Sequence, residues 1–193
     1  MKISLNWLKE YLSFEKERDA IISPELLAEQ LMMLGIEVEK TTFLGRGLES
    51  VVVGKIESVK AHPQADKLVI CQVDIGQKQD LQIVCGAPNA TSGLIVPVAL
   101  VGAILPNGLE IKTAQLRGVP SYGMLCSADE LKLSEDHSGL MELSDNLLIG
   151  TPLSKALDLD DIIMDLEITP NRPDCLSMVG IAREIRTIMS LNL

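Results

Sequence analysis

The chain has 193 residues, of which 47% are hydrophobic and 23% are charged, so it can build a folded core without disulfide bonds. Its formal net charge of −10 argues against a protein whose whole surface binds nucleic acid or an anionic membrane. Aromatic residues are only 3%, too few to stack several bases, and no apolar run approaches the ~18 residues of a membrane span, so we expect no membrane partner.

Helix signals dominate the first 44 residues. Ser4 is suited to cap a short helix, because leucines follow it at spacings of three and four. Ser23, followed by a proline at the first helical position, predicts a second helix, with Gly35 where a left-handed C-terminal residue is needed. Alternating apolar residues then predict a strand over residues 36–43.

From residue 51 the apolar period changes to two, and turn residues separate short apolar runs. The predicted strands are residues 51–59, 68–75, 81–85, 94–101, 111–116 and 123–126. Residues 119–120 (Val-Pro) are predicted to form a turn, and Ser127 to cap a brief helical turn. Five or six short strands in about a hundred residues predict a small closed barrel.

After residue 150 the helical signals return. Thr151-Pro152 predicts a short helix, residues 162–168 a strand, and the two prolines within residues 169–173 end both patterns. Asp174 is predicted to cap a last, long helix. Its apolar face would hold Met178, Ile181, Ala182, Ile185, Ile188 and Met189. No stop signal precedes Leu193, so we expect a piece of a longer protein.

The order helical, β, helical predicts an α+β fold class. Residues 1–44 and 151–193 would form one small discontinuous α+β docking domain, because neither segment alone is long enough for a convincing core. Residues 45–150 would be a β-barrel inserted into it, since a compact inserted domain often has its two ends close together.

The cysteines predict neither disulfides nor a metal site. They lie far apart, form no CxxC pair, and the two histidines lack zinc-ligand spacing. Buried reduced thiols and a cytoplasmic location, with no signal peptide, are the natural interpretation. Phosphate-loop, dinucleotide-binding, HExxH and GxSxG motifs are absent, so we predict no catalytic residue; His137 is read as a turn histidine.

Three segments carry more specific information: HPQADKL (62–68), VCGAPN (84–89) and LRGVPSYGMLCSADEL (116–131). In the first, Asp66 is expected to turn the chain by bonding its own backbone, which leaves Lys67 at a barrel rim beside Lys55 or Lys60. In the third, Arg117 offers a planar donor fork suited to phosphate. From these residues alone, solvated lysines at a strand connection are the simpler interpretation.

In this order and at these separations, the three segments look like the small tRNA-binding OB module. The flanks resemble the amino-terminal portion of the bacterial phenylalanyl-tRNA synthetase β subunit. That resemblance covers essentially the whole chain and is carried by MKISLNWL (1–8), LGIEV (34–38), DHSG (136–139) and TPNRPDC (169–175).

The resemblance implies that residues 45–150 form an OB-fold barrel of a non-catalytic part of a ligase. The complete enzyme would be an α2β2 assembly that joins phenylalanine to its tRNA with ATP and magnesium. Its aminoacylation site would lie in the α subunit and its editing site in later β-subunit domains, so we expect no cofactor here. The expected partners are tRNA, the remainder of the β subunit and the α subunit.

The candidate tRNA contacts are Lys55, Lys60, Lys67, Lys112 and Arg117, which would neutralise phosphates with little sequence information. Residues 45–150 carry 8 basic and 12 acidic residues, a net charge of −4, so we expect weak, nonspecific binding. Two alternatives stay open. One is an interaction scaffold without RNA contact, built on the last helix and the elbow at residues 170–173; the other is a free-standing tRNA-binding protein.

Overall fold

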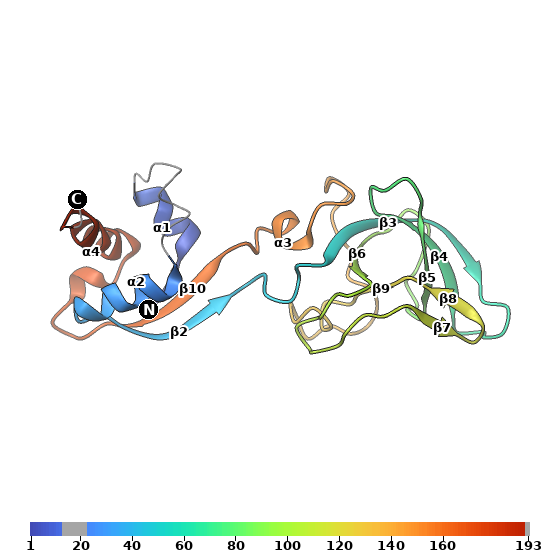
Figure 1. Cartoon of the computed structure of the whole chain (residues 1–193), viewed down its shortest axis with the longest axis horizontal. Helices are drawn as coiled ribbons and strands as arrows, with labels where there is room; N and C mark the ends of the chain where they lie inside the picture. Colours follow the sequence, from blue (N-terminus) through green and yellow to red (C-terminus); the bar gives the residue numbers. More distant parts are fainter. Residues whose placement is uncertain (13–22, 192–193) are drawn as a thin grey trace. The chain divides into compact units, whose positions relative to one another are not determined.

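The structure is a computed structural model that describes residues 1–12 and 23–191, with side chains as far as residue 187. It divides into two compact units, which Figure 1 follows along the chain. Met1–Leu44 and Asp160–Leu193 make one, called here the flanking unit, and Gly45–Leu159 makes the other, the barrel unit. None of the described helices is long and apolar enough to cross a bilayer.

The flanking unit is built on a three-stranded antiparallel sheet in the order β1-β10-β2. Its strands are β1 (Lys2–Ser4), β10 (Ile162–Glu167) and β2 (Glu37–Phe43). The predicted strands over residues 36–43 and 162–168 are thus confirmed. Strand β1 was not expected, because three residues are too few to display an apolar period of two.

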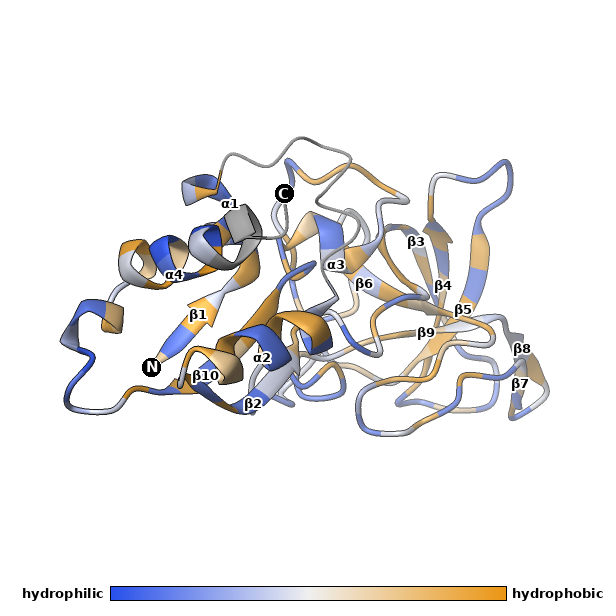
Figure 2. Ribbon diagram, turned by 60° about the vertical axis from the view of Figure 1, so that its left-hand side comes forward, coloured by the Kyte–Doolittle hydropathy of each residue, from blue (hydrophilic) through white to orange (hydrophobic). Residues whose placement is uncertain are grey.

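The first two helices of this unit, α1 (Leu5–Tyr11) and α2 (Pro24–Met33), begin where predicted. The Ser4 hydroxyl accepts a hydrogen bond from the Trp7 amide at 3.0 Å, and the Ser23 hydroxyl one from the Leu26 amide at 3.1 Å. Gly35 has φ +77°, as predicted. Hydrophobic and hydrophilic residues alternate around α2 and α4 (Figure 2). Their apolar residues, such as Leu31 and Ile181, pack in the unit's core with Ile3, Leu8 and Leu166.

The last helix, α4 (Met178–Leu191), is not capped by Asp174, so that prediction is wrong. Residues Pro173–Cys175 form a separate 3-10 turn, and the Ser177 hydroxyl accepts the Gly180 amide at 3.0 Å. Gly180 has no room for a Cβ because the Asp174 carbonyl lies against it, so the 3-10 turn packs on the helix instead of continuing into it. The predicted apolar face is buried as far as Ile185; the side chains of Ile188 and Met189 lie outside the described residues.

The barrel unit is mostly sheet. Its five-stranded antiparallel sheet runs β5-β4-β3-β6-β9 and comprises β3 (Val51–Ala61), β4 (Val69–Asp74), β5 (Leu81–Cys85), β6 (Ile95–Leu100) and β9 (Gly123–Leu125). The sheet nearly closes on itself, because the Tyr122 amide bonds the Gln82 carbonyl at 2.9 Å and the Val84 amide bonds the Ser121 hydroxyl at 3.1 Å. A small barrel was predicted, and this one is compatible with an OB-like barrel.

A separate hairpin of β7 (Ala114–Leu116) and β8 (Val119–Ser121) corrects two predictions. Residues 119–120 are strand, and the turn lies one step earlier, at Arg117 (φ +46°) and Gly118 (φ +85°). Two positive φ angles are what a tight two-residue hairpin turn requires. Pro120 fits because this sheet has only two strands, so each strand is an edge. The strand predicted over 111–116 starts later, because Ile111 bonds back to Ala103.

Residues 151–159 pack with the barrel. The Gly150 amide bonds the Val53 carbonyl at 2.8 Å, and the Val53 amide bonds the Thr151 carbonyl at 2.9 Å. The predicted short helix, α3 (Leu153–Ala156), follows and buries Leu153 in the barrel unit's core.

Candidate nucleic-acid interface

Two connections of the barrel unit meet at one buried side chain. They are the β3–β4 loop (residues 62–68) and the tip of the β7–β8 hairpin (residues 116–119). His62 is only 6% exposed, and its Nε2 lies 3.0 Å from the Leu116 carbonyl oxygen. Its Nδ1 accepts the Gln64 amide at 3.1 Å, and its own amide donates to the Leu68 carbonyl at 3.1 Å.

The turn expected at Asp66 is present, but the Asp66 side chain does not close it. Asp66 is exposed and makes no hydrogen bond within the described residues. The loop is shaped by His62 and by the Leu68 amide, which bonds the Ala65 carbonyl at 3.1 Å. An imidazole has the reach to bond backbone groups of two connections at once, which the short carboxylate of Asp66 lacks.

Three of the five candidate cations lie at this end of the barrel. Lys60 is exposed on β3 two residues before His62, Lys67 is exposed in the β3–β4 loop, and Arg117 is exposed at the hairpin tip. Across the described residues, none of these three side chains forms an ion pair. Their charges are therefore available to an external anion.

The other two candidates are paired with carboxylates. Lys55 Nζ lies 2.9 Å from Glu57 Oε1, and Lys55 faces Asp74 across the β3–β4 pair. The hydrogen bond to Glu57 raises the Lys55 pKa. Lys112 Nζ lies 2.7 Å from Glu110 Oε2, after a turn whose backbone bonds run within residues 102–111. The structure thus links the loop that carries Lys67 to the hairpin that carries Arg117 through His62, and these bonds involve neither Lys55 nor Lys112.

Polar and aromatic groups missed by the sequence argument adjoin these loops. Gln82 on β5 donates from Nε2 to the Pro120 carbonyl at 2.8 Å, and it lies opposite Gln72 on β4. Tyr122 follows β8 directly and is 45% exposed. The alternation of Gln72 with buried Cys71 and Val73 was the available signal, since it places the glutamine on the outer face.

The VCGAPN segment is hydrogen-bonded to the chain directly after the DHSG segment. The Asn89 side chain accepts the Leu140 amide at 2.8 Å and donates to the Leu140 carbonyl at 3.0 Å. Gly139 lies so close to this amide that a Cβ would collide with it. His137 is exposed and bonds only the Glu135 carbonyl, at 3.0 Å, while the Ser138 amide lowers the Asp136 pKa. These contacts support His137 as a turn histidine.

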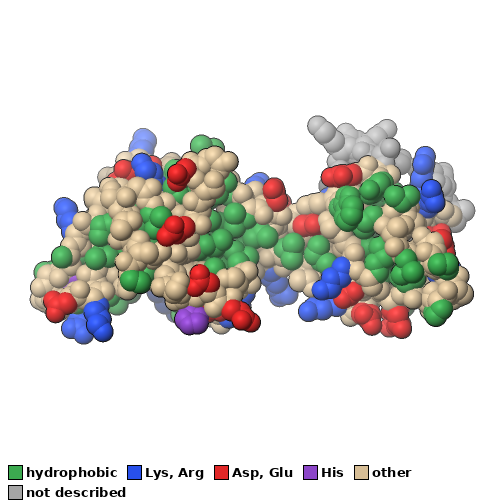
Figure 3. Space-filling model, turned by 180° about the vertical axis from the view of Figure 1, so that it is seen from behind, with side chains coloured by type: hydrophobic (Ala, Val, Ile, Leu, Met, Phe, Trp, Pro, Cys, Tyr) green, Lys and Arg blue, Asp and Glu red, His purple; other side chains and the backbone are tan. Residues whose placement is uncertain are grey.

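One face of the molecule carries no continuous field of basic side chains. On this face, drawn in Figure 3, blue basic and red acidic side chains are interspersed on each unit. This agrees with the net acidic composition of the chain.

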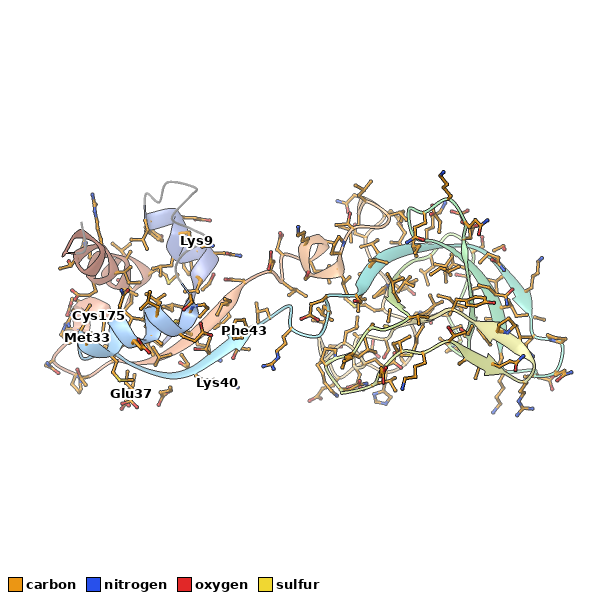
Figure 4. The ribbon with its side chains drawn as sticks, in the orientation of Figure 1. Lys9, Met33, Glu37, Lys40, Phe43 and Cys175 are labelled. Atoms are coloured by element: carbon orange, nitrogen blue, oxygen red, sulfur yellow. The ribbon has the colours of Figure 1, made fainter. Side chains whose placement is uncertain are left out.

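In the described parts of the chain, one cluster of potential metal ligands occurs, in the flanking unit. Asp174, Cys175 and Glu184 offer atoms within 4.8 Å of one another, with Cys175 by the C-terminal end of α2 (Figure 4). The Arg172 guanidinium lies 3.0 Å from both the Asp174 and Glu184 carboxylates and lowers the Asp174 pKa. The Arg172 side chain already occupies the space between these carboxylates. The three residues therefore do not fit magnesium, which takes oxygen ligands in a near-octahedral arrangement.

All four cysteines are buried and free, as predicted. Burial raises the pKa of Cys71 to about 11 and that of Cys126 to about 12, so both stay protonated near neutral pH. These thiols are neither nucleophiles nor metal ligands in this state.

The architecture is that of a small, nearly closed β-barrel module compatible with an OB-like barrel. The family described as "Putative tRNA binding domain" matches residues 51–152, which is more than half of the chain. The chain therefore belongs to that family.

Full-length relatives extend the match to both units. The chain is 48% identical over 193 residues to the phenylalanine–tRNA ligase β subunit of Nitratidesulfovibrio vulgaris, which covers 100% of this chain and 23% of the relative. It is 50% identical over 188 residues to that of Aromatoleum aromaticum, covering 97% and 23%. The chain thus spans about a quarter of the length of the curated relatives it matches, and the resemblance to the β-subunit family is confirmed.

A solved structure also matches about half of the chain. The methionyl-tRNA-synthetase-related protein from Pyrococcus horikoshii is 21% identical, with 53% of this chain and 87% of that chain covered and a TM-score of 0.40.

Proposed function

We propose that the barrel unit is an OB-fold that binds tRNA phosphates through Lys60, Lys67 and Arg117 and positions the RNA without chemistry. The observation that carries the proposal is the placement of three cations without ion pairs around two connections joined by His62. Exposed cations of this kind attract phosphates and release counterions, whatever the base sequence.

The strand order supports the choice of surface. In an OB-fold, the connection between the first two strands and the one between the last two flank the binding face. Here these are the β3–β4 loop, which carries Lys67, and the segment between β6 and β9, which contains the Arg117 hairpin. The outer glutamines of β4 and β5 lie opposite each other in this sheet.

Binding should be weak. Three exposed cations without a surrounding basic field give a small electrostatic attraction, and Tyr122 is the one aromatic side chain of the barrel unit. Lys55 and Lys112 would add little, because a phosphate would first have to displace a carboxylate from each.

At the level of the complete enzyme, the chain would be the N-terminal, non-catalytic part of a phenylalanine–tRNA ligase β subunit. That cytoplasmic α2β2 enzyme would attach phenylalanine to tRNA with ATP and magnesium held outside this chain. The identity to relatives named as β subunits, over nearly the whole chain, supports this assignment. No catalytic residue is assigned to the described residues.

The test is a tRNA titration of the chain at low and moderate salt. Replacing Lys60, Lys67 and Arg117 with alanine should weaken low-salt binding about 10-fold. The matched control, alanine at Lys55 and Lys112, removes two positive charges from the same unit and should change binding less than about 2-fold. Equal losses in the two variants would contradict the proposed surface.

A second candidate function is docking to the remainder of the β subunit through the flanking unit. Large apolar side chains are exposed there, including Met33 at 88%, Met32 and Leu176 at 61% each, and Trp7 at 52%. The relatives are about four times as long as this chain, and the remainder of such a β subunit would supply the surface that covers these apolar side chains. In the complete ligase, the triple-alanine variant should raise the KM for tRNA if the barrel positions RNA, and leave it unchanged if the chain is only a scaffold.

A further inference from the structure

We infer that His62 is a positioning residue that holds the Arg117 hairpin against the Lys67 loop, so that both cations can reach one stretch of phosphate backbone. The inference rests on the proposed function and adds to it a residue that itself touches no RNA. His62 is 6% exposed, so it is not available as a phosphate contact.

The hydrogen bonds fix which form of the imidazole performs this task. Nδ1 must act as an acceptor, because the Gln64 amide donates to it at 3.1 Å. The ring proton therefore sits on Nε2 and is donated to the Leu116 carbonyl at 3.0 Å. Each ring nitrogen thus serves one connection, Nδ1 the β3–β4 loop and Nε2 the hairpin.

The link matters because the hairpin has little else to orient its tip. The β7–β8 sheet has two short strands, and Leu116, which accepts the His62 bond, directly precedes Arg117. Gln82 bonds the other strand, at the Pro120 carbonyl. The Ser121 hydroxyl also accepts a bond from the Val84 amide, so β8 is held to β5. Without the His62 bond, the hydrogen bonds of β7 within the described residues would be those to β8 alone.

Two substitutions separate the two ring nitrogens. In His62→Gln the side-chain amide nitrogen lies near the position of Nε2 and can still donate to Leu116. In His62→Asn the shorter side chain places its carbonyl oxygen near the position of Nδ1, so the Gln64 bond is kept and the Leu116 bond is lost. Both replace a buried imidazole with a smaller amide, so they are matched in kind.

The experiment is a double-substitution cycle with Arg117→Ala, read by tRNA titration across a series of salt concentrations. His62→Asn should weaken binding by the same factor as Arg117→Ala, about 3- to 5-fold, and reduce the salt slope by about one phosphate contact. Adding His62→Asn to Arg117→Ala should cause no further loss. His62→Gln should bind like the wild type.

Amide hydrogen exchange without RNA provides a second readout. In His62→Asn the amides of β7 and β8 should exchange faster while those of β3 and β6 keep their protection, which also shows that the barrel is folded. Wild-type RNA binding by His62→Asn, or additive losses in the double variant, would overturn the inference. If the Lys60/Lys67/Arg117 triple-alanine variant bound like the wild type, the proposed function itself would fail; a weakened triple variant beside an unaffected His62→Asn would reject this inference alone.

Discussion

Two lysines of strand β3 lie in different electrostatic settings. In the middle of the strand, Lys55 is bonded to Glu57 at 2.9 Å and faces Asp74 on the neighbouring strand. Near its end, Lys60 has no ion pair in the described structure, and the loop and hairpin beyond it add Lys67 and Arg117. Under the proposed function, Lys60 is therefore available to a phosphate, whereas Lys55 is already occupied by a carboxylate.

Charge reversal should give the largest contrast between the cations without an ion pair and those paired with a carboxylate. Lys67→Glu with Arg117→Glu should weaken tRNA binding roughly 30- to 100-fold, because phosphates would then meet like charge. Lys55→Glu with Lys112→Glu changes the net charge equally and should cost about 3-fold at most. Filter binding or anisotropy at low salt measures both. Losses of similar size would mean that only the overall charge matters.

Backbone strain at the hairpin tip should give an intermediate effect. Gly118 has φ +85°, so Gly118→Ala should destabilise the barrel unit by about 1 kcal/mol and weaken RNA binding about 2- to 3-fold by displacing Arg117. Gly93 has φ +91° and equally open surroundings, so Gly93→Ala is a matched control. It should lose similar stability in thermal unfolding and keep wild-type RNA binding. An equal loss of RNA binding in Gly118→Ala and Gly93→Ala would contradict a specific role of the hairpin tip.

Removing the carboxylate partner of Lys55 should have the smallest effect on tRNA binding, and it should strengthen binding. Glu57→Gln removes the bond that raises the Lys55 pKa, but the ammonium stays charged near neutral pH. We expect tRNA binding to strengthen about 2-fold or less, equally at pH 6 and pH 8, because a counter-charge is lost and the Lys55 ammonium stays charged at both pH values. A gain that appeared at only one of the two pH values would show that a titrating group is responsible.

Local chemistry was predictable from the sequence, and long-range packing was not. Ser23, Gly35 and the five residues of β5 were assigned correctly because each signal is contained within a few residues. Asp174 failed as a helix cap because its carbonyl packs against Gly180, which no local pattern reveals.

The candidate site shows the same division. The five cations could be selected from the sequence, and the pairing of Lys55 with Glu57 could have been foreseen, since side chains two residues apart share a strand face. The bond from His62 to Leu116 spans 54 residues and depends on how two connections meet, so only the fold reveals it.

The salt dependence of tRNA binding tests the central claim most directly. Three phosphate contacts predict a slope of log affinity against log salt of about −2 to −3, and the Lys60/Lys67/Arg117 triple-alanine variant should approach zero slope. A wild-type slope that the triple variant left unchanged would contradict the account.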